Sequence, residues 1–403
     1  MQYTEYELGE LLPFEQPTAY IVKSTDYCDA YATPVLTAGK SFILGKTNET
    51  DGIFDQLPVI IFDDFTTATQ FVNFRFKVKS SAMKILHINT DLVIPKYIFY
   101  RLQIIQFDHS THKRYWIQSY SKIKVLIPPL DEQLRIVARI EELFSELDKA
   151  VDTLKTTKEQ LEVYRQAILQ QAFIGNSNYH KRKSSIPKAE FKPVDAKELV
   201  QLASLPQEWK YVYLSDLGNL SRGKSSHRPR NDPKLFENGV YPFFQTGDVK
   251  GAQKDLYNCE KKYNDVGLAQ SKLWPAGTLC ITIAANIAET CFLGVDGCFP
   301  DSIVGFIPND NLVLKEYIRF FIEASKLKLW AYAPATAQKN INLSTLENLI
   351  VPYCGIEEQQ YIVQKIEEID SVCNKLEQTI DIALAQADAM RQSILKQSFE
   401  EKI

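Results

Sequence analysis

The 403-residue sequence has few of the features that mark membrane, secreted or disulfide-bonded proteins. No apolar run approaches the ~20 residues that a helix needs to cross a bilayer. The first residues, MQYTEYELGELL, have neither the basic region nor the apolar core of a signal peptide. The seven cysteines, an odd number without C-x-x-C spacing, argue for reduced thiols and against a zinc ribbon. Together these absences predict a cytoplasmic protein.

The residue patterns that catalytic sites need are also missing. The five scattered histidines form no nucleophile and base arrangement. No strand runs into a glycine-rich turn for S-adenosylmethionine, and no Asn-Pro-Pro-aromatic or Asp-Pro-Pro-aromatic motif could hold a flipped base. Asp63 and Asp64 are adjacent, which favours a strand end or turn over a metal site because neighbours on a strand point to opposite faces. Cys280, Cys291 and Cys298 lie among apolar residues and are expected in the core. We therefore expect a chain that is not an enzyme by itself and that binds no cofactor or metal.

One segment matches the pattern of a phosphate-binding loop, G-x-x-x-x-G-K-[ST], from Gly218 to Ser225. Such a loop must run into a helix whose N-terminus faces the phosphates, but Pro229 and Pro233 forbid a regular helix here. An ATPase is therefore not expected. The segment from Arg222 to Lys234 instead forms a basic loop, in which Asp232 is the single acidic residue among the cations Arg222, Lys224, His227, Arg228, Arg230 and Lys234. The formal net charge of −4 does not indicate a nucleic-acid-binding protein, yet the field that attracts a phosphate backbone is local. A merely solvated run of charge is the alternative.

A long segment of the sequence occurs twice. LIPPLDEQLRIVARIEEL (126–143) returns as LIVPYCGIEEQQYIVQKIEEI (349–369), with an offset of 358 − 132 = 226 residues. The match continues without a gap to RQAILQQAF (165–173) and RQSILKQSF (391–399). The second copy replaces IPPL by VPYCGI, which leaves its local turn open. Duplication of a globular unit and a helix favours two reading sites or two docking faces over one catalytic pocket.

The regions around these repeats predict two mixed α/β domains, each followed by a long helix. Short β-rich runs and one helical pattern occur in the same order in residues 1–129 and 206–352. Residues 130–174 and 353–403 carry heptad patterns with apolar d positions, which predict an antiparallel coiled coil between the two helices. Separate docking of each helix on another protein is the alternative. Residues 175–205, with Pro187, Pro193 and the cluster 180–183 (His-Lys-Arg-Lys), are expected to form a linker.

This arrangement resembles the specificity subunit of Type I restriction-modification systems. The motifs that carry the resemblance are IPPLDEQLRIVARIEELFSELD, YRQAILQQAFIG, ATAQKNINLSTLENLIVP, EQPTAYIVKSTDY and PVLTAGKSFILGKTNE. The resemblance implies two target recognition domains, each reading one half of a bipartite DNA sequence. It also implies helices that act as a spacer and as the docking platform for two modification (methyltransferase) subunits, through which restriction (translocase-nuclease) subunits join. S-adenosylmethionine, ATP and magnesium would then belong to the partner subunits.

Candidate DNA contacts follow from residue type and loop position, since Arg and Lys pair with guanine and Asn and Gln with adenine. In the first domain they are Thr37, Lys40, Lys46, Asn48, Thr111, His112, Lys113 and Arg114. In the second domain they are Arg222, Lys224, Ser225, His227, Arg228, Arg230, Gln245, Thr246, Gln338, Lys339 and Asn340. The aromatic residues Tyr115, Trp116, Phe243, Phe244 and Trp330 are expected in the core rather than against DNA. A different class of function, a helical scaffold, adaptor or inhibitor whose domains bind protein, would lack the steep salt dependence of DNA binding.

Overall fold

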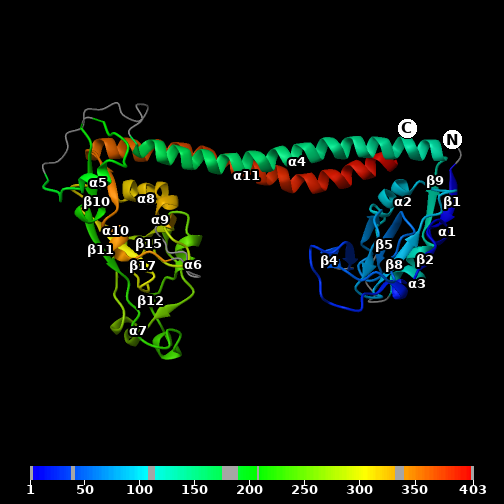
Figure 1. Cartoon of the computed structure of the whole chain (residues 1–403), viewed down its shortest axis with the longest axis horizontal. Coiled ribbons are helices and arrows are strands. Elements are labelled where there is room, and N and C mark those ends of the chain that lie inside the picture. Colours follow the sequence, from blue (N-terminus) through cyan, green and yellow to red (C-terminus); the bar gives the residue numbers. More distant parts are fainter. Residues whose placement is uncertain are drawn as a thin grey trace. The chain divides into compact units, whose positions relative to one another are not determined.

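The computed structural model describes residues 3–37, 41–107, 114–174, 189–206, 208–331 and 340–400. The chain divides into two compact units, whose elements are labelled in Figure 1. The first unit consists of Met1–Thr156 and Ile380–Ile403, and the second of Thr157–Thr379. In the described part of the chain no helix is long and apolar enough to span a membrane.

The first unit is built on an antiparallel sheet. In the described residues its strand order is β2 (Phe14–Glu15), β8 (Met83–His87), β5 (Val59–Asp63) and β6 (Thr69–Val72). A second sheet has the order β4 (Ile43–Thr47), β3 (Thr33–Leu36) and β7 (Lys77–Val78), and a ribbon pairs β1 (Thr4–Glu7) with β9 (Lys124–Ile127). The helices are α1 (Leu8–Leu11), α2 (Pro95–Leu102) and α3 (Tyr115–Gln118). β5 is buried along its whole length, as its uninterrupted apolar run predicts.

The second unit repeats this plan with additions. Its larger sheet runs β11 (Gly218–Arg222), β17 (Ile303–Pro308), β15 (Leu279–Thr282), β16 (Thr290–Leu293) and β13 (Asp255–Leu256) among the described residues. Its two ribbons are β10 (Lys210–Tyr213) with β18 (Ile350–Tyr353), and β12 (Tyr241–Pro242) with β14 (Lys262–Tyr263). Its helices are α5 (Ala196–Leu199), α6 (Thr246–Gly251), α7 (Asp265–Ala269), α8 (Lys315–Ala324), α9 (Lys326–Ala331) and α10 (Leu343–Glu347).

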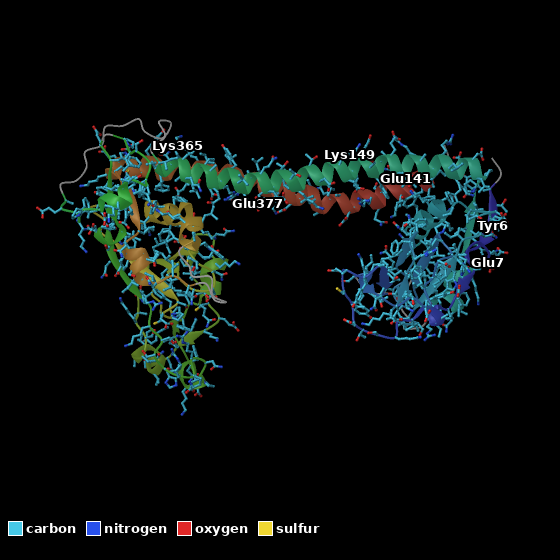
Figure 2. All side chains as sticks on the ribbon, in the orientation of Figure 1. Tyr6, Glu7, Glu141, Lys149, Lys365 and Glu377 are labelled. Atoms are coloured by element: carbon cyan, nitrogen blue, oxygen red, sulfur yellow. The ribbon has the colours of Figure 1, made fainter. Side chains whose placement is uncertain are left out.

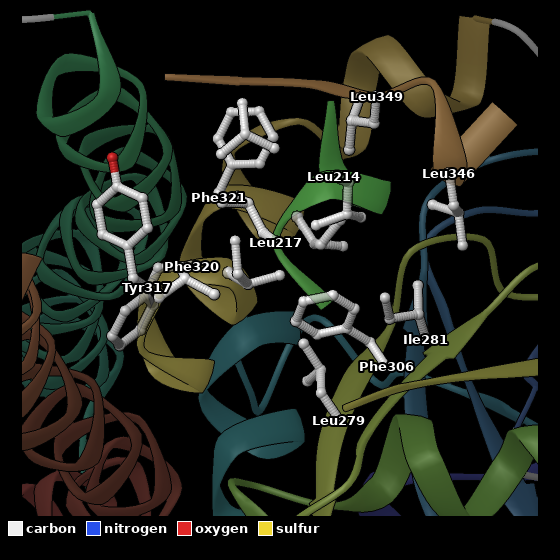
Figure 3. Close-up of a cluster of buried hydrophobic side chains, with 14 of the residues drawn as sticks. Leu214, Leu217, Leu279, Ile281, Phe306, Tyr317, Phe320, Phe321, Leu346 and Leu349 are labelled. Carbon is white, nitrogen blue, oxygen red and sulfur yellow. The ribbon is translucent and has the colours of Figure 1, made fainter. Parts of the chain in front are cut away.

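The two units therefore share a fold. The order β2-β8-β5-β6 corresponds to β11-β17-β15-β16, with the same antiparallel pairings, and α2 and α8 follow the corresponding strands β8 and β17. Figure 3 shows the core of the second unit, where Ile281 of β15 and Phe306 of β17 lie with Tyr317 and Phe321 of α8. The mixed α/β architecture predicted from the sequence is confirmed.

Two long helices, α4 (Leu130–Phe173) and α11 (Ile356–Glu400), follow the globular parts. Their apolar d positions are all buried or half-buried: Ile140, Leu147, Leu154, Leu161 and Ile168 in α4, and Ile366, Cys373, Ile380, Ala387 and Ile394 in α11. The predicted stripe is thus the covered face of each helix.

The helices contact each other in antiparallel sense inside each unit. In the second unit, Arg165 of α4 forms an ion pair with Asp370 and donates to Asn374 Oδ1 at 2.8 Å. At the corresponding position in the first unit, Arg391 of α11 pairs with Asp148 of α4. Both arginines belong to the repeated RQ motif. The regular side-chain interlocking of a coiled coil stays a prediction.

Each long helix also ends in the unit where the other begins. α4 begins in the core of the first unit and ends in that of the second, where the Phe173 ring lies 5.0 Å from Tyr317. α11 begins in the core of the second unit, and its Phe399 ring lies 5.3 Å from Tyr97 of the first. The repeated helix ends are therefore used for equivalent contacts.

The repeated Glu-Gln pair stands where each globular part joins its helix. Gln133 is fully buried, and its Nε2 donates to Leu92 O at 3.0 Å and to Pro128 O at 2.9 Å. Its Oε1 accepts from Ile94 N–H at 2.8 Å. The helix starts alike in both copies, because the amide N–H groups of Gln133 and Gln359 donate to Pro129 O and Gly355 O. The change from IPPL to VPYCGI leaves this turn unaltered.

The second half of the predicted linker is not a free chain. Phe191 lies 5.0 Å from the Tyr353 ring and 4.1 Å below the Lys210 ammonium, and Tyr211 Oη donates to Ala203 O. Residues 189–206 thus cover the β10–β18 ribbon, since an aromatic side chain in a polar segment gains by burial. The basic cluster 180–183 lies outside the described residues.

Candidate nucleic-acid interface

The basic loop of the second unit follows β11 and is fixed to a neighbouring segment. A Cβ atom at Gly223 would lie 2.3 Å from Phe299 O, so only glycine fits there. Lys224 N–H donates to Phe299 O at 3.0 Å. In the described residues, the element after β11 is a short 3₁₀ helix at Pro233–Leu235. The phosphate-binding motif is thus not followed by the helix that ATP binding requires, as the prolines predict.

The cations of this loop differ in whether their side chains already have partners within the chain. Arg222 and Lys224 are exposed and have no ionic or hydrogen-bonding side-chain partner in the part of the chain that the structure describes. Arg228 Nη1 donates to Ser225 O and His227 O at 2.7 and 2.8 Å. Arg230 pairs with Asp301 at 2.8 Å. Among the predicted contact residues of the loop, Arg222 and Lys224 are therefore the cations most available to a ligand.

Two predicted contact residues of the loop are used to hold its shape. Ser225 is only 4% exposed, and its hydroxyl lies 3.2 Å from Tyr263 Oη, so its side chain does not reach the surface. His227 Nε2 lies 2.9 Å from Asp232 Oδ2. The Lys234 main-chain N–H and, after it, the His227 ring lower the pKa of Asp232. Ser225 is thus a structural residue rather than a ligand-contacting one.

Two predicted segments of the second unit bond directly to residues 298–302, and a third is linked to them through Ile283. Besides Lys224 N–H on Phe299 O, Phe244 N–H donates to Cys298 O at 2.8 Å. Ile283 N–H donates to Ser302 O, and Ile341 N–H donates to Ile283 O. The exposed side chains of this second candidate surface are Arg222, Lys224, Arg228, Arg230, Gln245 and Asn340, with Thr246 half-buried at the start of α6.

The first unit repeats the convergence around residues 78–83. Leu36 pairs in parallel with Val78, as Phe243 does with Cys298. Lys79 N–H donates to Leu36 O, and Tyr115 N–H donates to Asp64 O. The predicted residues brought to this first candidate surface are Thr37, half-buried, and Arg114, exposed. Segments that share only their order in the sequence therefore occupy equivalent places.

Other predicted residues of the first domain are elsewhere or outside the description. Lys46 pairs across from Pro34, roughly 10 Å along the strand from Thr37, and Asn48 lies beyond it. The Lys46 ammonium donates to Asp29 O at 3.4 Å. Lys40, Thr111, His112, Lys113, Gln338 and Lys339 lie outside the described residues. Lys46 and Asn48 are thus separated from the first candidate surface.

Two exposed lysines at these surfaces carry no sequence signal. Lys79 follows β7 beside Leu36, where Phe299 stands in the second unit. Lys272 donates to Ser221 Oγ at 2.9 Å and lies 3.6 Å from the Trp274 ring centroid, next to the basic loop. Both positions depend on contacts between distant segments, strand pairing for Lys79 and a side-chain hydrogen bond to Ser221 for Lys272, which no local motif encodes.

The aromatic residues and cysteines expected in the core are buried, except for Trp330. Tyr115, Trp116, Phe243 and Phe244 are buried, and Trp330 is 38% exposed. Cys280, Cys291 and Cys298 are fully buried, and burial raises the pKa of the Cys280 thiol. These cysteines are core residues, as predicted. No group of three or more His, Cys, Asp or Glu residues that could hold a metal ion occurs in the described part of the chain.

Asp63 ends β5 and Asp64 begins the turn that follows, as predicted, and both side chains make structural contacts. Asp63 closes a turn by accepting from Phe65 N–H and the Thr66 hydroxyl. Asp64 Oδ1 accepts from Trp116 N–H at 2.8 Å, and its Oδ2 lies 3.3 Å from the buried Lys84 ammonium. Asp64 thus ties the start of α3 to the central sheet.

A family model described as the Type I restriction modification DNA specificity domain matches residues 2–163 and again residues 206–386. The chain belongs to this family. The specificity subunit of the Type I restriction enzyme EcoR124I/EcoR124II of Escherichia coli is 31% identical over 381 residues, covering 92% of this chain and 87% of that protein. The EcoBI specificity subunit of Escherichia coli is 23% identical over 281 residues, covering 68% and 57%.

Solved structures of specificity subunits share the fold of the chain. The HsdS subunit from Thermoanaerobacter tengcongensis aligns with 100% of this chain and 97% of its own, at 17% identity and a TM-score of 0.56. A chain from a structure on complex assembly and conformational transition of the type I R-M system aligns over 100% and 98%, at 17% identity and a TM-score of 0.66. The two family matches support two target recognition domains in one specificity subunit, and they do not support the scaffold or inhibitor alternative.

Proposed function

We propose that each target recognition domain of this specificity subunit reads one half of a bipartite duplex through its candidate surface. The observation that carries the proposal is the double convergence of sequence-distant loops, on residues 298–302 and on residues 78–83. Exposed cations at both places suit phosphate contacts, and Gln245 and Asn340 carry amides that suit adenine edges. The two surfaces carry different residues, as two unrelated half-sites require.

The long helices dock two identical modification subunits in this proposal. The exposed residues Glu142, Ser145, Lys149 and Thr153 of α4 recur as Glu368, Ser371, Lys375 and Thr379 of α11. Their spacing places them on one helix face, and Lys149 is labelled in Figure 2. Nearby exposed positions have changed, since Glu146 corresponds to Val372 and Lys155 to Asp381. Two copies of one solvent-facing stripe suit two copies of one partner.

The chain acts in this proposal as a non-catalytic subunit in the cytoplasm. Methylation, translocation and cleavage would be carried out by the modification and restriction subunits, which would bind S-adenosylmethionine, ATP and magnesium. The basic loop supports this division of labour, because its backbone serves strand pairing and turns rather than a phosphate cradle.

Charge removal at the basic loop tests DNA reading. Arg222→Ala with Lys224→Ala is expected to weaken binding of the assembled complex to its target by at least tenfold, and to reduce the salt slope by up to about 2. Lys192→Ala with Lys197→Ala is the control, because both lysines are exposed in the segment that covers the β10–β18 ribbon. Equal affinity of the two double variants would contradict the proposed surface, and a flat salt dependence of the native complex would contradict DNA binding.

A further inference from the structure

The three hydrogen bonds of Gln133 recur at Gln359, the same residue 226 positions later in the sequence. Gln359 is fully buried, and its Nε2 donates to Leu312 O at 3.0 Å and to Cys354 O at 2.8 Å. Its Oε1 accepts from Leu314 N–H at 2.9 Å. Each glutamine thus joins the first turn of a long helix to the turn before α2 or α8 and to the residue after β9 or β18.

From this geometry we propose that Gln133 and Gln359 are positioning residues, which fix the angle between each recognition domain and its long helix. They would thereby determine which separation between half-sites the subunit accepts. The inference rests on the proposed reading of a bipartite duplex and adds a role that the candidate surfaces do not have.

Apolar packing at this junction restricts the angle of the helix less than the hydrogen bonds do. Ile136, Val137 and Ile140 of α4 lie in the core of the first unit, and their burial is favourable over a range of helix tilts because hydrophobic attraction has no preferred direction. Hydrogen bonds weaken steeply when they bend. Three of them, to groups on two other segments, define one orientation of the helix.

A small change in the angle between the domain and its helix displaces the far end of the helix by about one base-pair step of DNA. From Gln133 to Thr156, the end of the helix within the first unit, α4 runs for roughly 35 Å at ~1.5 Å per residue. A tilt of about 5° at the glutamine moves the far end by roughly 3 Å, which is close to the 3.4 Å step of one base pair. Loss of the glutamine is therefore expected to relax the required separation by about one base pair.

The test compares buried and exposed glutamines in the full chain, assembled with modification subunits. Gln133→Met and Gln359→Met keep the length of the side chain and remove its hydrogen bonds. Gln360→Met is the matched control, because Gln360 is the next residue along and is exposed. The probes are synthetic duplexes that carry the mapped target with its native spacer, or with one base pair added or removed.

The native complex and Gln360→Met are expected to lose at least tenfold in affinity when the spacer changes by one base pair. Gln133→Met and Gln359→Met are expected to lose less than threefold for the same change. Variants that keep the native preference, even if they melt at a lower temperature, would show that the glutamines only stabilise the fold, and would overturn the inference while leaving DNA reading intact.

A failure of the variants to fold and a failure of the native complex to bind DNA lead to different conclusions. If the Met variants do not fold, Gln133→Glu and Gln359→Glu replace them, since they keep the length and one acceptor. If no replacement folds, the glutamines serve folding and the inference is wrong. A native complex that binds no bipartite duplex would instead refute the proposed function, and the inference with it.

Discussion

The two units contain equivalent sheets but differ in the side chains that are buried beside them. By strand register, Asp64 and Lys84 of the first unit correspond to Ile283 and Val304 of the second. All four side chains are buried, with exposed fractions of 2%, 0%, 0% and 0%. An ion pair and an apolar pair thus fill equivalent places. The fold itself does not need the charges, and the first unit uses Asp64 to hold the start of α3 beside its candidate surface.

The largest expected effect comes from breaking this ion pair. Lys84→Val alone leaves the Asp64 carboxylate buried without its cation, and removal of one partner of a buried pair costs about 3–5 kcal/mol. Asp64→Ile with Lys84→Val transplants the second unit's residues and is expected to recover part of that loss, because it removes the buried charge but also the acceptor of the Trp116 N–H. Urea denaturation, with hydrogen exchange of β5 amides to resolve the first unit, measures both. A double variant less stable than the single one would contradict this account.

A somewhat smaller difference is expected at the two helix ends. Phe173 is 4% exposed between Tyr317 and Phe321, so Phe173→Ala should cost about 3–4 kcal/mol. Phe399 is only partly buried, beside Tyr97 and Arg101, and Phe399→Ala should cost about half as much. Unit-resolved hydrogen exchange would measure the two losses. Equal losses would mean that the two junctions are energetically alike despite their different burial.

Smaller effects are expected from the lysines that have no sequence signal. Lys79→Ala and Lys272→Ala should each weaken DNA binding by about threefold to tenfold and lower the salt slope by about 1. Competition with half-site mismatches separates the two surfaces, because each substitution should reduce discrimination at one half-site only. Lys192→Ala, in the segment that covers the β10–β18 ribbon, is the control. If Lys79→Ala affected the half-site that Lys272→Ala affects, the assignment of one surface to each half-site would be wrong.

The smallest expected effect concerns the turn that Asp232 closes in the basic loop. The folded-state pKa of this carboxyl is lowered from its ordinary 3.8, first by the Lys234 N–H. The stabilising contribution of the ionised Asp232 carboxylate is therefore fully present above the unfolded pKa of 3.8. It is lost as pH falls through the lower folded pKa. Protection of the Lys234 amide against hydrogen exchange should decline in that range. Asp232→Asn, which cannot titrate, should show no such decline.

The sequence predicts the periodic parts of this molecule and much less of its surfaces. The heptad pattern predicts the long helix α4, because five apolar d positions recur along a helix of about twelve turns and local errors average out. By contrast, β7 and β2 have two residues each, too few for any period to be read. The places of Lys79 and Lys272 follow from contacts between segments that are distant in the sequence.

Several repeated residues of the helices contact this chain itself, which the sequence alone does not indicate. Similar copies predict shared partners, yet Gln133, Arg165 and Phe173 repeat at positions where both copies contact the rest of this chain. The proposed docking of identical partners rests instead on exposed repeated residues such as the polar stripe from Glu142 to Thr153 and its second copy. Ser225 is the converse case, since a hydroxyl beside cations suits DNA but tertiary packing buries it.

The exchange of helix ends has a consequence for the order of folding during synthesis. The second unit is one continuous stretch, Thr157–Thr379, whereas the first needs Ile380–Ile403 as well as its own N-terminal residues. The N-terminal part of the first unit is therefore made well before Leu395 and Phe399, which complete its core. A chain that stops after Thr379 would contain every residue of the second unit but would lack the Ile380–Ile403 part of the first. The first unit can thus complete its core only after the segment that follows the second unit has been made.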